Sequence, residues 1–287
     1  MIELLLRHYR RFALFAGGLG LYVAFALAAF GLEFSSLELA AIFAAVCVAS
    51  CAMAVGLYFT IPGKRGLLEV TGTSALICAA LIYFTSNVFT AGLTKGIFVV
   101  ILLIMLTCGI WIGLNGKWSR KIGEQTTWRD RHSGHVPYPA RLVWRHAVPG
   151  AADPADHCTG MMEHYREDDE DPDTVHVTFK GRKDRAADYT LTFLERDQPS
   201  ACRFFFQGTE ADGTVVDGIF SLRLTVLERD ACFMSCVEER CGLSLGRLVE
   251  RWFDDTLGYQ YDKLLEKLDA LYGDTYGPRR SSMMAAE

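Results

Sequence analysis

Residues 97–114 place the strongest constraint on how this chain can fold. The stretch reads IFVVILLIMLTCGIWIGL and contains no charged residue. A helix needs roughly 20 apolar residues to cross a hydrocarbon core of ~30 Å. Lys117, Arg120 and Lys121 follow directly, and the chain never becomes as hydrophobic again. We therefore expect membrane-spanning structure up to this stretch and a water-soluble domain after it.

Three further apolar runs precede this one, and together they predict spans at residues 12–30, 39–61, 67–89 and 97–115. A signal peptide is the competing interpretation of the first run, because Arg10 and Arg11 precede it and small residues occur near its end. The run is longer than the roughly 7–15 apolar residues of a signal peptide, and three more runs follow. Residues 1–118 are thus predicted to form a four-helix transmembrane domain.

The loops between the runs predict the orientation. Basic residues occur before the first run, at Lys64 and Arg65 in the second loop, and after the fourth run, whereas the first loop has none. Loops rich in Lys and Arg stay on the cytoplasmic side. We expect a multi-pass protein of a bacterial inner membrane with both termini in the cytoplasm.

The polar and small residues of the spans bear on function. No ionisable residue lies near the middle of a span, which argues against a transporter or channel. Glu69, at the start of the third run, is expected at a solvated headgroup position. Gly109 and Gly113 allow close approach of another helix. That helix could belong to the same bundle or to another membrane protein, and we predict these glycines as partner-helix contacts.

Charge separates the two halves of the chain. Residues 1–118 carry 7 Lys and Arg against 4 Asp and Glu, whereas residues 119–287 carry 22 against 30. An acidic domain is a poor partner for nucleic acid, which needs a basic surface. The five cysteines of this half include no CxxC pair, a pattern typical of reduced cysteine in the cytoplasm.

Residues 119–132 read as a linker, 133–273 as a soluble domain, and 274–287 as a disordered tail. From Val175 the apolar residues recur with period two and predict five antiparallel strands joined by short turns. Val226 is expected to face inward and Glu238 outward. Residues 244–272 then show the 3,4 spacing of one long amphipathic helix, with Ser244 as its N-cap.

Residues 151–173 form a polar stretch between these elements. His157, Cys158 and His164 occur here, but the paired spacing of a zinc site is missing. The acidic run that follows lacks the spacing of a calcium loop. We expect a solvated hairpin loop, and predict no metal and no cofactor.

The sequence VPYPARLVW at residues 136–144 and the apolar helix at 248–271 resemble the helix-grip, or START-like, superfamily that includes polyketide cyclases and Bet v 1-like proteins. The resemblance covers about half of the chain. It implies an α+β domain in which an antiparallel sheet surrounds a long C-terminal helix, with a cavity for an apolar ligand. It implies no catalytic residue. The usual Trp after the first helix has no match at residues 151–160.

Ligand-binding residues are predicted among the large side chains that face this cavity, although each also suits an ordinary core. Apolar pockets need a few converging polar groups, and Tyr259, His164 and Arg223 are the candidates. Arg223 faces outward unless the register shifts by one residue. The predicted lining residues are Tyr189, Phe193, Cys202, Phe204, Phe206, Phe220, Met234, Cys236, Trp252 and Tyr259.

Three functions remain open. The first is a membrane-tethered module that binds a lipid, quinone or pigment at the cytoplasmic surface of the inner membrane. The second is an accessory or assembly subunit of a larger membrane complex. The third is an enzyme of the cyclase or hydratase type, which would need an acid–base pair that the sequence does not display. The expected partners are membrane lipids, an apolar small molecule and an integral membrane protein.

Overall fold

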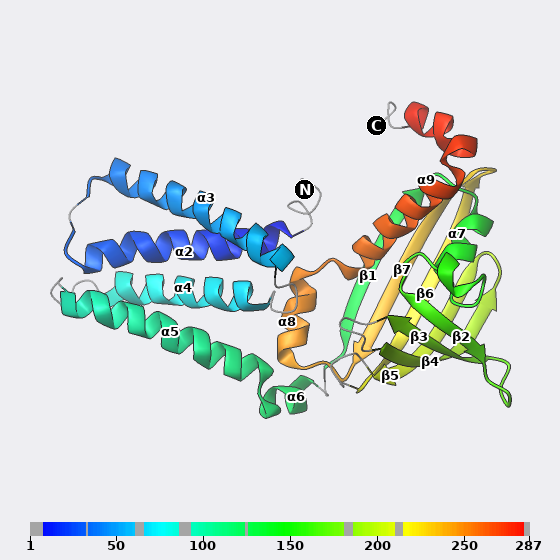
Figure 1. Ribbon diagram of the computed structural model, residues 1–287, viewed down its shortest axis with the longest axis horizontal. Coiled ribbons are helices and arrows are strands. Elements are labelled where there is room, and N and C mark those ends of the chain that lie inside the picture. The colour runs from blue at the N-terminus through cyan, green and yellow to red at the C-terminus, as the bar shows by residue number, and fades with distance from the viewer. Residues whose placement is uncertain are drawn as a thin grey trace. The chain divides into compact units, whose positions relative to one another are not determined.

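The computed structural model of the chain describes residues 8–32, 34–60, 66–85, 93–123, 126–180, 186–209 and 215–283 (Figure 1). The chain forms two compact units. The first comprises residues 1–121 and 244–255, and the second comprises residues 122–243 and 256–287. The polypeptide therefore leaves the first unit, builds most of the second, returns to the first for a short segment, and ends in the second.

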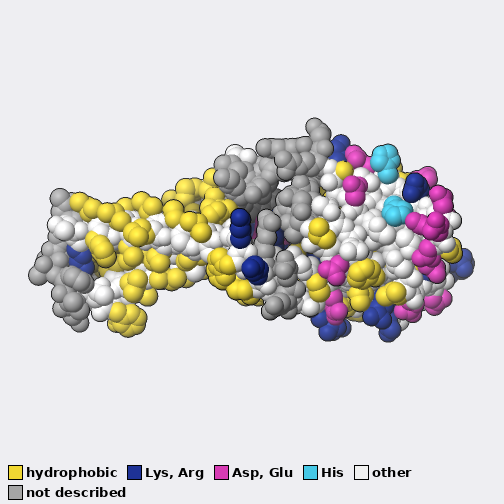
Figure 2. All heavy atoms as spheres, turned by 90° about the horizontal axis from the view of Figure 1, so that it is seen from below, with side chains coloured by type: hydrophobic (Ala, Val, Ile, Leu, Met, Phe, Trp, Pro, Cys, Tyr) yellow, Lys and Arg dark blue, Asp and Glu magenta, His cyan; other side chains and the backbone are white. Residues whose placement is uncertain are grey.

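The first unit is built from α2 (Tyr9–Ala29), α3 (Ser36–Thr60), α4 (Gly66–Thr85) and α5 (Leu93–Asn115). Among the described residues these four helices are long and apolar enough to cross a membrane. Their number agrees with the four predicted spans. Large apolar side chains of α3 and α5 face outward, including Val48, Met53, Phe98 and Met105. Hydrophobic side chains dominate the visible face of these helices in Figure 2.

Small residues bring α2 and α4 together. A Cβ atom on Gly18 would lie 2.4 Å from the carbonyl oxygen of Gly72, and one on Gly72 would lie 2.8 Å from the carbonyl oxygen of Leu14. The two backbones are therefore in direct contact. Gly109 has no atom within 4 Å of its Cβ position, and the nearest atom to that of Gly113 belongs to Trp118 at 3.7 Å. Their contact with a partner helix stays a prediction.

Among the described residues, the first unit also contains most of the short helix α6 (Lys117–Gly123), which crosses its boundary, and the short helix α8 (Leu245–Phe253). Ser244 caps α8 by accepting a hydrogen bond from the Arg247 N–H, as predicted. The N–H of Leu245 donates to Ser119 Oγ at 2.9 Å, and α8 packs against α4 and α5. The predicted single helix at 244–272 is wrong, because the helix ends at Phe253 and Asp254 is extended.

Buried charges join the end of α8 to the long apolar helices α2 and α4. Arg11 on α2 is 0% exposed and forms an ion pair with Glu69 on α4, which is 2% exposed. Arg11 Nη2 also lies 3.1 Å from Asp254 Oδ1, and His8 Nδ1 lies 3.5 Å from the same oxygen. The predicted solvated position of Glu69 is thus wrong, because Arg11 compensates its charge inside the unit. Asp254 lies at the break between α8 and the next helix.

The second unit contains one antiparallel sheet of seven strands in the order β1-β7-β6-β5-β4-β3-β2. Neighbouring strands from β2 to β7 follow one another in the chain, whereas β1 pairs with the last strand, β7. The strands are β1 (Trp128–Val136), β2 (Met162–Glu167), β3 (Thr174–Lys180), β4 (Ala186–Asp197), β5 (Ala201–Thr209), β6 (Val215–Glu228) and β7 (Ala231–Cys241).

Strands β3 to β7 correspond to the five predicted strands. The two outermost strands, β1 and β2, lie where the sequence predicts a linker and a polar loop. Most side chains of both are exposed or half-buried, so they carry little apolar alternation. Val226 is exposed rather than inward, because it lies near the end of β6, where residues 225–228 are all exposed.

Helix α9 (Thr256–Met283) supplies the other half of the core. Its Leu257, Leu264 and Leu268 are buried in one cluster with side chains of the sheet and of α7 (Ala140–Ala147). Trp144 on α7 and Tyr138 before it are among the largest fully buried side chains. The helix extends past Gly273, where the sequence predicts its end. An antiparallel sheet packed against one long C-terminal helix is the predicted α+β arrangement, and it places a cavity beside that helix.

Candidate functional site

A cavity of about 380 Å³ lies between the inner face of the sheet, the segment after α7, and α9. This volume falls within the ~300–1,000 Å³ that is usual for small-molecule sites. The lining combines side chains from strands β3 to β7 with residues 147–161 and one residue of α9. The lining residues are Ala147, Pro149, His157, Cys158, Thr159, Met161, Phe179, Lys180, Ala187, Tyr189, Leu191, Phe204, Phe206, Phe220, Glu238, Arg240 and Gln260.

Aromatic rings from four strands form the apolar wall. Tyr189 meets Phe179 edge-on at a centroid distance of 6.0 Å and meets Phe206 edge-on at 6.2 Å. Phe204 and Phe220 stack at 5.1 Å with an interplanar angle of 26°. Period-two alternation places these rings on one face of the sheet. Such edge-on and offset pairs are the favoured aromatic geometries, so the wall is an ordered ring surface.

Two charged residues of β7 form a polar wall. Arg240 Nε donates a hydrogen bond to Glu238 Oε1 at 2.6 Å. The Arg240 guanidinium also lies 5.0 Å from the centre of the Phe206 ring. Glu238 is only 5% exposed, so the pair is removed from water although it lines the cavity. The predicted outward orientation of Glu238 is wrong.

The segment after α7 adds His157 and Cys158. His157 Nδ1 lies 2.8 Å from Thr159 Oγ1, and the Lys267 ammonium donates to the carbonyl oxygens of Ala155 at 2.7 Å and His157 at 3.2 Å. Desolvation, opposed by a backbone hydrogen bond with Ala147 and assisted by the Lys267 charge, lowers the pKa of His157 to about 4. Desolvation raises the pKa of the Cys158 thiol to about 12. Both side chains are therefore uncharged at neutral pH.

His157 makes the stability of the second unit depend on pH. The unfolded chain takes up a proton at this residue below pH 6.5, whereas the folded chain does so only near pH 4. The unfolded state binds more protons in that window, so stability is lost as the pH falls. We expect a loss of about 2 kcal/mol from this residue between pH 7 and pH 5.

Urea unfolding of the full chain at the two pH values, followed by near-UV circular dichroism, measures this loss. His157→Gln should reduce the pH dependence by the stated amount. The control, His164→Gln, replaces an exposed histidine on β2 and should leave it unchanged. Equal pH dependence in both variants would contradict the assignment.

The predicted ligand-binding residues divide into two groups. Tyr189, Phe204, Phe206 and Phe220 line the cavity together. Of the others, Trp252 is 55% exposed on α8 in the first unit, and Tyr259 is 53% exposed on α9. Phe193, Met234, Cys202 and Cys236 are buried in the core but do not line the cavity. The two polar candidates His164 on β2 and Arg223 on β6 are exposed.

Sequence reasoning missed Glu238, Arg240 and Gln260. The signal for the first two was present, because they share the parity of Cys232, Met234 and Cys236 along β7. A charged residue in phase with an apolar strand face indicates a polar group aimed at the interior. Gln260 had no comparable signal, because its direction depends on how α9 turns against the sheet.

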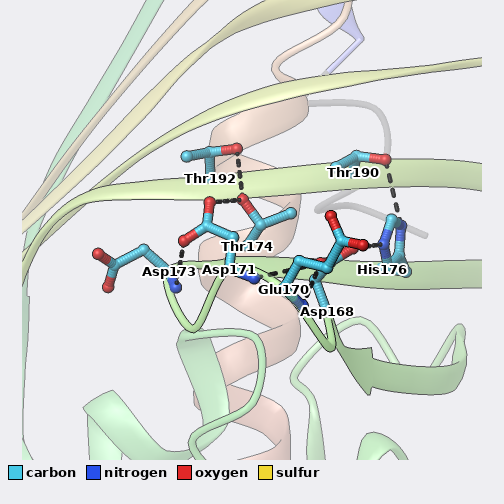
Figure 3. A network of polar contacts seen from close by, with 8 residues as sticks. All are labelled: Asp168, Glu170, Asp171, Asp173, Thr174, His176, Thr190 and Thr192. Atoms are coloured by element: carbon cyan, nitrogen blue, oxygen red, sulfur yellow. Dashed lines mark hydrogen bonds and ion pairs between the residues drawn. The ribbon is translucent and has the colours of Figure 1, made fainter.

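A second polar group lies at the β2–β3 hairpin and the outer face of β3 and β4 (Figure 3). Asp168 Oδ2 lies 2.9 Å from His176 Nε2, and His176 Nδ1 lies 3.3 Å from Thr190 Oγ1. This order matches a carboxylate, base and hydroxyl group. A hydroxyl nucleophile needs nearby free N–H groups that can stabilise an oxyanion. Thr190 lies in the middle of the sheet, paired with His176 on one side and Gln207 on the other, so its backbone is engaged in strand pairing. We assign the group a structural role.

The remaining contacts of this group order the acidic loop that the sequence predicts. Asp168 Oδ1 accepts the N–H of Glu170 at 2.9 Å, and Asp171 Oδ2 accepts the hydroxyl of Thr174 at 2.7 Å (Figure 3). These carboxylates thus cap the turn between β2 and β3. Across the described part of the chain, no three His, Cys, Asp or Glu side chains are grouped so that they could hold a metal ion.

Comparison with protein-family models and with curated proteins finds no match for the chain. Solved structures with a similar arrangement include a conserved protein from Geobacillus kaustophilus, with 10% identity, a TM-score of 0.41, and coverage of 52% of this chain and 97% of that one. A truncated norcoclaurine synthase from Thalictrum flavum shows 15% identity and a TM-score of 0.37, covering 49% and 92%. Ara h 8.0201 shows 8% identity and a TM-score of 0.39, covering 50% and 99%.

The strand order, the antiparallel hairpins and the buried face of α9 define the fold of the second unit. The C-terminal half of this chain therefore has a helix-grip fold, an antiparallel sheet packed against one long C-terminal helix, and it follows four long apolar helices.

Proposed function

We propose that this protein is a membrane-tethered binding module for an apolar small molecule. The observation that carries the proposal is the cavity of about 380 Å³ in the helix-grip domain. Its aromatic wall supplies apolar contact area, and the few polar groups of β7 and α9 would orient the ligand, as in most small-molecule sites. A quinone, pigment or lipid has the apolar surface that such a wall binds.

The four long apolar helices support the tether. On the distribution of Lys and Arg, we propose a bacterial inner membrane with both termini in the cytoplasm. Apolar ligands partition into the bilayer, so a binding domain held at the membrane works where its ligand is concentrated. Tethering raises the effective concentration without adding any contact.

A second function is favoured by the outward faces of α3 and α5. The Cβ position of Gly109 is open, and Phe98 and Met105 are exposed on the same helix. An open glycine on an apolar helix suits close packing by a helix of another protein. An accessory or assembly subunit is therefore the alternative, and a stable hetero-complex in mild detergent would support it.

A paired substitution tests the binding function. Ala187 lines the cavity, whereas its neighbour Ala186 is exposed on the same strand. Ala187→Trp should fill the cavity, because the added indole occupies volume that the ligand needs. Ala186→Trp adds the same group outside it. The full chain is extracted in mild detergent, and copurifying apolar molecules are quantified by mass spectrometry.

We expect the wild type and Ala186→Trp to retain a defined apolar molecule and Ala187→Trp to lose at least about 90% of it, which is a tenfold effect. Recovery that is the same in all three proteins would mean that the molecule is bound elsewhere. Circular dichroism spectra that match between the variants exclude unfolding as the cause.

A further inference from the structure

Helix α8 lies across one end of the four-helix unit (Figure 1). At its start, Gly246 lies against the end of α5, where a Cβ atom on it would be 3.0 Å from the carbonyl oxygen of Leu114. Directly after its end, Asp254 lies 3.1 Å from Arg11 in the first turn of α2. Between these points α8 packs against α4. If the long apolar helices cross a bilayer, α8 therefore runs in the plane of the membrane surface, at the level where they end.

The apolar stripe of α8 is only partly covered by the unit. It comprises Leu245, Leu248, Val249, Trp252 and Phe253. Successive residues of a helix lie 100° apart, so Phe253 and Trp252 stand on different sides of this stripe. Phe253 is buried, whereas Trp252 is 55% exposed. One side of the stripe thus packs on the unit, and the open side suits a helix that lies in the membrane interface and faces lipid.

Aromatic and basic side chains surround this end of the unit. The Arg10 guanidinium lies 5.6 Å from the centre of the Trp252 ring and 5.8 Å from that of Tyr9. Trp and Tyr prefer the boundary between hydrocarbon and water, and the long side chains of Lys and Arg reach from there to polar headgroups. The exposed residues of this kind, which we call the interfacial rim, are Tyr9, Arg10, Lys117, Trp118, Lys121 and Trp252.

The sequence is rich in basic residues at this end of the helices. The segments that flank the helices here contain 10 Lys and Arg against 5 Asp and Glu, and they are residues 1–11, 61–69, 115–121 and 244–255. The segments at the other end, residues 30–38 and 86–96, contain one against two. An excess of cations at the level of the membrane surface is complementary to the phosphate groups of anionic phospholipids.

The buried and half-buried charges of this end balance in number. They are Glu69, Glu250 and Asp254 against Arg11, Arg247 and Arg251. Arg11 pairs with both Glu69 and Asp254, and Arg247 pairs with Glu250 at 2.9 Å. His8 Nδ1 lies 3.5 Å from Asp254 Oδ1 and adds positive charge when the imidazole is protonated. The exposed side chains therefore set the sign of the surface.

The interfacial rim is positively charged. Arg10, Lys117 and Lys121 are exposed, and the exposed acid beside them is Asp255, which attracts Arg10. Helix α6 contains no acidic residue. An anionic headgroup thus meets two exposed cations on α6, and one on α2 for which it competes with Asp255.

We propose that α8 is an interfacial helix in the plane of the membrane, and that the interfacial rim binds anionic phospholipid headgroups of the cytoplasmic leaflet. Trp118 and Trp252 lie at the boundary of the hydrocarbon, and the three cations of the rim bind the phosphate groups. The inference rests on the membrane placement in the proposed function, but it does not depend on the cavity.

Quenching of tryptophan fluorescence by brominated lipids tests the site. In a background of Trp111→Phe and Trp118→Phe, Trp252 is the remaining tryptophan of the first unit. The full chain is reconstituted in phosphatidylcholine vesicles that contain a minor share of brominated phosphatidylglycerol or, in a parallel sample, brominated phosphatidylcholine. The part of the quenching that Trp252→Phe abolishes measures each lipid at Trp252.

We expect phosphatidylglycerol to be favoured at Trp252 by at least about fivefold, and bromines near the headgroup to quench more than bromines near the chain ends. Arg10→Gln should lower the preference about fivefold, which corresponds to about 1 kcal/mol for one cation near an anionic surface. The control, Lys95→Gln, removes a cation near the opposite end of α5 and should leave the preference unchanged.

A second variant keeps the test valid if Arg10→Gln fails to fold. Trp118 is then the reporter, in a background of Trp111→Phe and Trp252→Phe. Lys117→Gln removes the cation next to it and should lower the preference for phosphatidylglycerol by a similar factor.

The outcomes decide the inference and separate it from the binding function. Equal quenching by the two brominated lipids would show that the rim does not select anionic lipid. Quenching that Trp252→Phe leaves unchanged, or that is strongest with bromines near the chain ends, would show that α8 is not at the interface. If any of these results is found while Ala187→Trp still removes a copurifying apolar molecule, the inference fails and the binding function stands. If anionic lipid is selected but Ala187→Trp retains that molecule, the binding function fails and the inference stands.

Discussion

Replacement of Arg11 by Met is expected to destabilise the four-helix unit by about 3–5 kcal/mol, the cost of leaving a buried charge without its partner. Arg11 is fully buried and is paired with Glu69 and Asp254. Without the guanidinium, the Glu69 carboxylate stays 2% exposed with no opposite charge from Arg11. Loss of folded protein during titration with a denaturing detergent, followed by circular dichroism, measures the effect.

Arg10→Met is the matched control, because Arg10 is exposed on the next position of the same helix. It should change stability by less than about 1 kcal/mol, as exposed charges do. The double variant Arg11→Met, Glu69→Met should recover most of the loss, since well-packed apolar residues can replace a buried ion pair. If Arg11→Met were as stable as Arg10→Met, the ion pair would not hold the unit together.

Replacement of Gly18 by Leu should also destabilise the four-helix unit. Overpacking typically costs ~1–3 kcal/mol, and we expect a loss at the upper end of this range. Its Cβ atom would meet the backbone oxygen of Gly72 at 2.4 Å, and backbone atoms cannot rotate away as a side chain can. The helices α2 and α4 would have to separate, which removes their shared contact surface.

Gly17→Leu provides the control, because no atom lies within 4 Å of the Cβ position of Gly17. Both substitutions replace glycine by the same good helix former, so the intrinsic helix preference cancels between them. The same detergent titration measures both variants. Similar stability of the two would refute the close crossing of α2 and α4.

The contrast between Gly18 and Gly109 shows what sequence spacing can predict. Both lie in apolar runs with neighbouring small residues, and the Gly109–Gly113 spacing was the more conspicuous. The structure uses Gly18 and Gly72 for a contact within the bundle, and leaves Gly109 open. Which face of an apolar helix meets another helix depends on packing partners, and a nearly uniform apolar surface carries little directional signal.

The cavity likewise combines residues that the sequence predicts with residues that only the packing places. Four of its aromatic residues were predicted, because strands alternate faces and large rings cluster on one of them. Trp252 has the apolar spacing of a helix that covers the sheet, yet it lies on α8 in the first unit. A stripe of apolar residues predicts burial but not the surface against which the burial occurs.

The sequence by itself determined four long apolar helices and the five central strands, because these depend on local periodicity and composition, and it carried the resemblance that implied a helix-grip fold. Only the tertiary structure decided the return of residues 244–255 to the first unit, the burial of Glu69 and the inward Glu238–Arg240 pair. Arg11 and Asp254 lie near opposite ends of the chain, and their attraction exists only after folding brings them within 3.1 Å. Buried charges are stable only with their partners, and such pairing of distant residues leaves no local pattern in the sequence.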